Sequence, residues 1–150
     1  MRKFQFRLQT VLGVREAREK EMLRRLGDAQ RQVQLAELRK KDLQTALADV
    51  LLKRELLGQE AVSVNAFRTV QDFVDGTKHR ILMAEQGILR AKRGLEKALR
   101  GYLQARRQTR TLELLREKQL QEYKITRRRA EQREQDEMQV MRARFREASE

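Results

Sequence analysis

The stretch that decides the fold is residues 81–105, ILMAEQGILRAKRGLEKALRGYLQA. Every third or fourth residue in it is apolar: Ile81, Ala84, Ile88, Ala91, Leu95, Ala98, Tyr102 and Ala105. A spacing that averages about 3.5 residues keeps these side chains on one narrow stripe of a helix that supercoils with a partner helix. The repeat extends outward over 67–112, where Thr77 and Thr109 are its only two polar positions.

A second repeat of the same kind precedes this one. It runs from Leu8 to Leu57 and has eleven apolar residues in fifteen positions; charged residues interrupt it at Arg15, Glu19, Lys40 and Arg54. Two such repeats predict an all-α fold, a long two-helix antiparallel coiled-coil hairpin. We expect a single domain over 1–150, with helix one at about 5–57, a turn at about 58–64 and helix two at about 65–146.

The connection between the repeats carries the expected helix-end residues. Gly58 is suited to the left-handed conformation that often follows a helix C-terminus. Ser63 or Asn65 can accept a hydrogen bond from the first free amides of helix two. Folding the chain there pairs residue i with roughly residue 121 minus i, so Leu8 lies beside Glu113. Helix two therefore overhangs helix one, and residues 116–150 lack a partner helix.

Composition restricts the class of protein. The chain has 150 residues and no proline, as expected where almost every residue is helical. It has no cysteine, which excludes disulfides, thiol nucleophiles and zinc–thiolate sites. No stretch has the length and apolarity of a signal peptide or a membrane span, so we expect a soluble, untranslocated protein.

Nothing in the sequence indicates catalysis. The only histidine, His79, lies off the apolar stripe, two positions from both Thr77 and Ile81, and no phosphate-binding loop or metalloprotease motif occurs. The sequence therefore predicts a protein that is not an enzyme, with no catalytic residues, no metal site and no cofactor.

The net charge of +13 favours an acidic partner. The basic excess is +5 over 1–62, +7 over 63–112 and +1 over 113–150. The run Arg127-Arg128-Arg129 could bind an acidic protein or nucleic acid, or be a solvated face that the acidic residues of 131–137 nearly neutralise.

Phe73 is either folded over the apolar stripe or an exposed anchor for a partner. The glycines at 87, 94 and 101 either allow close approach of another surface or are merely tolerated.

Three segments carry a resemblance to a known family. They are FQFRL at 4–8 with VL at 11–12, SVNAFRTVQDFV at 63–74, and EQREQDE at 131–137. In this order and spacing they resemble the FliJ proteins of the bacterial flagellar type III export apparatus. The resemblance implies a cytoplasmic coiled coil, peripheral to the inner membrane at the flagellar base and similar to the central stalk subunit of rotary ATPases.

The resemblance also implies partners and contact residues. The partners are the ring of the export ATPase FliI, the cytoplasmic domain of the export gate protein FlhA, and export chaperones. Candidate ATPase-binding residues are Phe4, Phe6, Arg127, Arg128, Arg129, Asp136 and Glu137; candidate gate-binding residues are Phe73, Thr77 and Arg80. We expect no specific nucleic acid and no membrane span.

Two alternatives remain. The equivalent stalk of a virulence-type secretion system would share the architecture and differ in its partners. A basic coiled-coil nucleic-acid-binding protein would account for the net charge, and its binding would fall steeply with salt.

Overall fold

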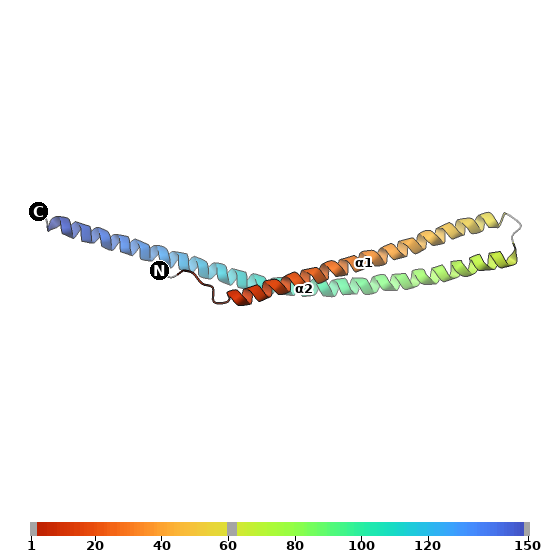
Figure 1. Cartoon of the computed structure of the whole chain (residues 1–150), viewed down its shortest axis with the longest axis horizontal. Coiled ribbons are helices and arrows are strands. Elements are labelled where there is room, and N and C mark those ends of the chain that lie inside the picture. Colours follow the sequence, from red (N-terminus) through yellow and green to blue (C-terminus); the bar gives the residue numbers. More distant parts are fainter. Residues whose placement is uncertain (1–2, 60–62, 149–150) are drawn as a thin grey trace. The chain divides into compact units, whose positions relative to one another are not determined.

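The computed structural model describes residues 3–59 and 63–148, and they form two helices (Figure 1). α1 spans Gln9–Leu57 and α2 spans Val64–Glu147. The helices pack antiparallel, which confirms the predicted all-α, two-helix hairpin. The predicted turn over 58–64 lies partly outside the described residues.

The contacts within the chain divide it into two units. One is Lys20–Gln104, in which α1 from Lys20 onward lies beside α2 up to Gln104. The other combines Met1–Glu19 with Ala105–Glu150, so it holds the start of α1 and the rest of α2. Each candidate surface described below lies within one unit.

The two heptad repeats form the seam between the helices. Every position of both repeats is buried or half-buried except Leu8 and Phe67. Val74 is fully buried, and Leu12 is 1% exposed. The two polar positions of the second repeat are buried as well, Thr77 at 2% and Thr109 at 1% exposure. The Thr109 hydroxyl donates to the Ala105 carbonyl, so this polar group is satisfied within its own helix.

The charged residues that interrupt the first repeat pair across the seam. Lys40 Nζ lies 2.9 Å from Glu85 Oε1, and Arg54 Nη1 donates to Gln71 Oε1 at 3.1 Å. In the other unit Glu19 accepts from Arg106 at 3.2 Å, and Arg15 donates to Gln108. Long side chains of this kind cover the seam with their stems and keep their charges at its edge, so the interruptions do not break the pairing.

These cross-helix contacts differ in register from the simple folding rule. Lys40 meets Glu85 where the rule gives residue 81, and Arg54 meets Gln71 where it gives Phe67. The cause is the tilt of helical side chains, which point toward the N-terminus of their own helix. In an antiparallel pair the side chains of the two helices therefore tilt toward each other's Cα positions from opposite directions. A side chain of α1 then meets a residue of α2 that lies a few positions later in sequence than the residue level with its own Cα.

The ends that face the connection differ in part from expectation. Gly58 is not left-handed, because no described glycine has a positive φ. Its amide instead donates to the Arg54 carbonyl at 3.0 Å, and the Gln59 amide to Leu56 at 3.2 Å, so α1 closes with one tighter right-handed turn. Of the two predicted caps, Ser63 is used: its hydroxyl accepts from the Ala66 amide at 3.3 Å.

Candidate protein-binding surfaces

The N-terminal residues pack on the part of α2 that was predicted to lack a partner, residues 116–150. α1 begins at Gln9, not near residue 5, and the Gln9 amide donates to the Phe6 carbonyl at 3.1 Å. The segment before it runs beside α2 (Figure 1). Phe6 is only 7% exposed, and the ring centroid of Phe4 lies 5.7 Å from that of Tyr123. These contacts cover the first part of the overhang and hold Phe4 and Phe6 against one stretch of α2.

The basic run follows directly on the same helix. Arg127 Nε donates to Glu131 Oε1 at 2.7 Å, and this hydrogen bond and the carboxylate charge raise the pKa of the Arg127 guanidinium above its ordinary value. Arg128 and Arg129 are exposed and make no ion pair with another described residue. Arg127 thus stabilises the helix locally, while its two neighbours are free to bind an acidic partner.

Asp136 and Glu137 lie further along α2. They are nine residues beyond Arg127 and Arg128, which is about 13 Å at the helical rise. All residues from 131 to 148 are exposed. The seven candidate ATPase-binding residues therefore lie along one unit, but they form a strip and not a single cluster.

The three candidate gate-binding residues do not share one surface. Phe73 is 45% exposed beside the fully buried Val74, so its ring is half covered by the seam. Arg80 is exposed, whereas Thr77 is 2% exposed and lies inside the seam. Phe73 and Arg80 can contact a partner directly. Thr77 can act only by holding the helix that carries them.

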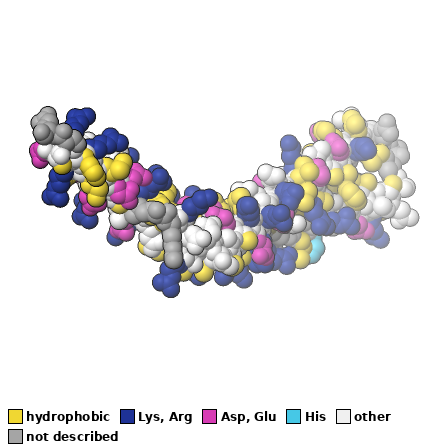
Figure 2. Space-filling model, turned by 60° about the vertical axis from the view of Figure 1, so that its left-hand side comes forward, with side chains coloured by type: hydrophobic (Ala, Val, Ile, Leu, Met, Phe, Trp, Pro, Cys, Tyr) yellow, Lys and Arg dark blue, Asp and Glu magenta, His cyan; other side chains and the backbone are white. Residues whose placement is uncertain are grey.

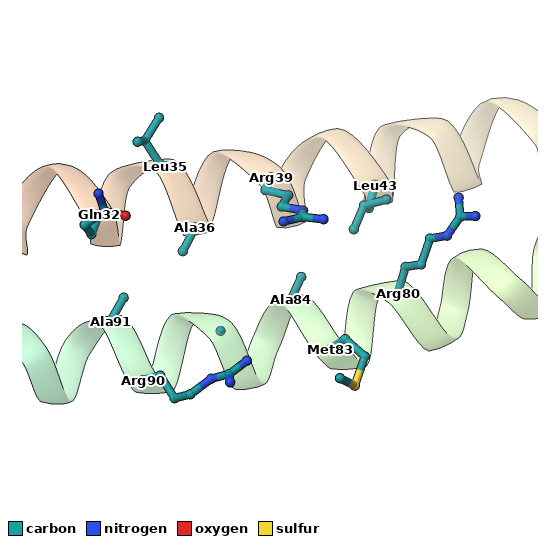
Figure 3. A pocket seen from close by; sticks show the side chains of 11 residues that line it. Gln32, Leu35, Ala36, Arg39, Leu43, Arg80, Met83, Ala84, Arg90 and Ala91 are labelled. Atoms are coloured by element: carbon teal, nitrogen blue, oxygen red, sulfur yellow. The ribbon is translucent and has the colours of Figure 1, made fainter.

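Sequence reasoning missed a groove between the helices in Lys20–Gln104 (Figure 3). It has a volume of about 460 Å³. Ala36 of α1 and Ala84 and Ala91 of α2 point toward the opposite helix, and these small side chains leave the seam hollow. Its lining also includes three arginines and no acidic residue: Arg39, Arg80 and Arg90. Alanine at three seam positions of the heptads was the signal that could have predicted it.

Of the glycines at 87, 94 and 101, only Gly101 lies against a described residue of the other helix. A Cβ at Gly101 would lie 3.5 Å from Met22 Sδ, so this glycine lies against α1 of its own hairpin. Gly87 and Gly94 face open space.

Basic side chains are spread over the visible face with acidic ones between them, and they do not gather in one patch (Figure 2). His79 is exposed.

The described residues contain neither a metal-binding cluster nor a membrane-spanning helix. No cluster of three or more His, Cys, Asp and Glu side chains is placed to hold an ion. Neither α1 nor α2, as described, contains a stretch apolar enough to cross a membrane.

These features define a class, a helical-hairpin protein whose candidate sites are exposed surfaces on the helices. The chain belongs to the FliJ family: the model for "Flagellar FliJ protein" matches residues 4–148. This confirms the family that the three sequence segments indicated. The family is a non-enzymatic component of flagellar protein export.

A solved structure with the same fold comes from Chlamydia trachomatis and is described as a YscO homologue. It superposes with a TM-score of 0.65 over 99% of this chain and 100% of that chain, at 16% sequence identity. No functionally curated protein matches the chain in sequence.

Proposed function

We propose that this chain binds the ring of the flagellar export ATPase, promotes its assembly and activity, and links it to the export gate. The observation that carries the proposal is the family match, which takes in 145 of the 150 residues, from 4 to 148. We place the protein on the cytoplasmic side, peripheral to the inner membrane at the flagellar base. Export chaperones are further proposed partners.

The unit that combines Met1–Glu19 with Ala105–Glu150 is proposed to contact the ATPase ring. Its support is the strip of candidate residues that this unit presents, with the docked Phe4 and Phe6 at one end and Asp136 and Glu137 beyond. Arg128 and Arg129 have no acidic partner in the described chain, so their charges are available to carboxylates of the ring.

The unit Lys20–Gln104 is proposed to contact the gate through Phe73 and Arg80. The two lie seven residues, or about two helical turns, apart, and aromatic residues and arginine are enriched in protein–protein interfaces. Thr77 has a supporting role in this proposal, because its side chain is buried in the seam of the same helix.

The ATPase contact is tested by mixing the full chain with the export ATPase from the same organism at about 0.15 M salt. We expect co-elution and raised ATP turnover, both lost on deletion of 1–7 or of 130–150. The double variant Arg128→Glu/Arg129→Glu should weaken binding at least tenfold. Arg93→Glu/Arg100→Glu is the matched control, because it makes the same charge change at two exposed arginines of the other unit that have no ion pair with another described residue. No complex with the folded wild-type chain would rule out the ATPase assignment.

The gate contact is tested with the cytoplasmic domain of the gate protein. Phe73→Ala should lower its affinity, and so should Arg80→Glu. Leu82→Ala is the control, because Leu82 is 59% exposed on the same helix and outside the proposed contact. Equal effects of Phe73→Ala and Leu82→Ala would contradict the assignment.

A second candidate function is the corresponding role in a virulence-type secretion system. The observation that favours it is the shared fold with the chlamydial YscO homologue. The same co-elution experiment with a virulence-type ATPase separates the two, since the true partner should bind at least tenfold more tightly than the other.

A further inference from the structure

Residues 131–148 form the last part of α2, and no other described helix runs beside them; we call them the terminal segment. Ala130 is the last half-buried residue, and every residue from 131 to 148 is exposed. Figure 1 shows no second element beside this end of α2. Met138 and Met141 are spaced by three residues, so they share one apolar face, and they are 58% and 63% exposed.

The charges of the terminal segment are divided between its halves. Residues 131–138 contain four acidic residues and one arginine, and residues 139–148 contain three arginines and one glutamate. Glu137 and Arg144 flank the same edge of the apolar face, seven residues apart. Neither side chain makes an ion pair or hydrogen bond with another described residue. Both charges are therefore available to a partner.

We propose that the terminal segment docks antiparallel on the terminal segment of a second copy of this chain. In an antiparallel pair of heptads, Met138 of one copy lies opposite Met141 of the other, and Met141 opposite Met138. The same register sets residue 131 opposite residue 148. The overlap thus coincides with the stretch that is exposed in one chain, and it stops before the docked N-terminal residues at Tyr123.

Charge complementarity identifies the occupant as a second copy in this orientation. The antiparallel register brings Glu137 beside Arg144 of the second copy, and the two-fold symmetry makes this pair twice. It also lays the acidic half of each segment along the basic half of the other. A parallel pair would align acidic with acidic and basic with basic, which is repulsive.

The proposed interface is short, about two and a half turns on either side of its two-fold axis. Interfaces of this size are small compared with those of stable dimers, so we expect a weak, reversible dimer that forms at roughly 0.1 mM chain. Both Glu137 and Arg144 are exposed, so replacing them leaves the fold of the hairpin intact.

The first test is sedimentation equilibrium of the full chain from about 10 to 500 µM. Wild type should fit a monomer–dimer equilibrium. Glu137→Arg and Arg144→Glu should each weaken it about five- to tenfold, because two attractions become two repulsions. The double variant Glu137→Arg/Arg144→Glu should return to within threefold of wild type. Arg146→Glu, the same charge change facing away from the interface, should have no effect.

The second test uses the absence of cysteine from the chain. A mixture of Met138→Cys and Met141→Cys chains should oxidise mainly to the mixed disulfide, because these two positions face each other in the antiparallel register. A parallel dimer would instead give disulfides within each variant. A monomer at all concentrations, or a double variant as weak as the single ones, would overturn the proposal.

Both tests use the chain alone, so their outcome is independent of ATPase binding. Capture of the segment only by the ATPase ring, with no self-association, would assign its apolar face to the ring and also refute the dimer.

Discussion

Replacement of Phe6 by alanine should undock the N-terminal segment from α2. The Phe6 side chain is 7% exposed, and deleting a buried phenylalanine ring costs about 3–5 kcal/mol. A chain terminus can relax around the lost ring, so we take the lower value of about 3 kcal/mol. Since about 1.4 kcal/mol is a factor of ten, this cost lowers the docking equilibrium about a hundredfold.

The assay is release of the N-terminal peptide by trypsin after Arg7. Cleavage requires the segment to leave α2, so its rate follows the population of the undocked form when docking is fast. We expect Phe6→Ala to raise the rate at least tenfold. Its helical circular dichroism should stay unchanged, because residues 3–8 lie before the start of α1.

The matched control is Phe67→Ala, since Phe67 is 51% exposed and lies in the other unit. It should leave the cleavage rate at the wild-type value. If Phe6→Ala and Phe67→Ala differ by less than twofold, the docked segment does not depend on Phe6 and the reasoning fails.

Three further predictions concern the seam, a helix cap and the partner. Val74→Ala should lower the free energy of unfolding by about 2 kcal/mol in urea titrations, and Val14→Ala, at a 64% exposed site, by less than about 0.5. If 1–150 is one domain, Leu12→Ala should shift the same single transition. Ser63→Ala should cost about 1 kcal/mol by the same titration, because it removes the cap of α2. Affinity for the ATPase should fall less than about tenfold from 50 to 200 mM salt; a loss of about a thousandfold or more in affinity for DNA instead would favour the nucleic-acid alternative.

Periodicity predicted the seam well because burial follows the heptad and not the chemical type of each residue. Thr77 and Thr109 look like breaks in the pattern, yet both are almost completely buried. Lys40 looks like a break as well, and it reaches Glu85 across the seam edge. A helix side chain can occupy its position by its stem while its polar end finds a partner.

The N-terminal contact was not predictable in the same way. Phe4 and Phe6 are two residues apart, which is too short a pattern to indicate a structure. The ring partner of Phe4, Tyr123, is more than one hundred residues away in sequence. Tyr123 follows Leu112 in a stretch where the second heptad repeat has few apolar residues. The prediction that Gly58 adopts the left-handed conformation was wrong because it also rested on a local pattern alone. A glycine after a helix permits that conformation but does not require it. Here α1 ends in a right-handed turn with two backbone hydrogen bonds.

The two proposed contacts of the terminal segment, with the ATPase ring and with a second copy of the chain, exclude each other. Glu137 is a candidate contact for the ATPase ring and also the acidic half of the proposed pair with Arg144 of a second copy. A chain whose terminal segment is paired with another copy cannot present Glu137 to the ring. The disulfide-linked dimer of Met138→Cys and Met141→Cys should therefore stimulate the ATPase less than its reduced form does. Equal stimulation by both forms would mean that the ring contacts only the docked N-terminal residues and the basic run.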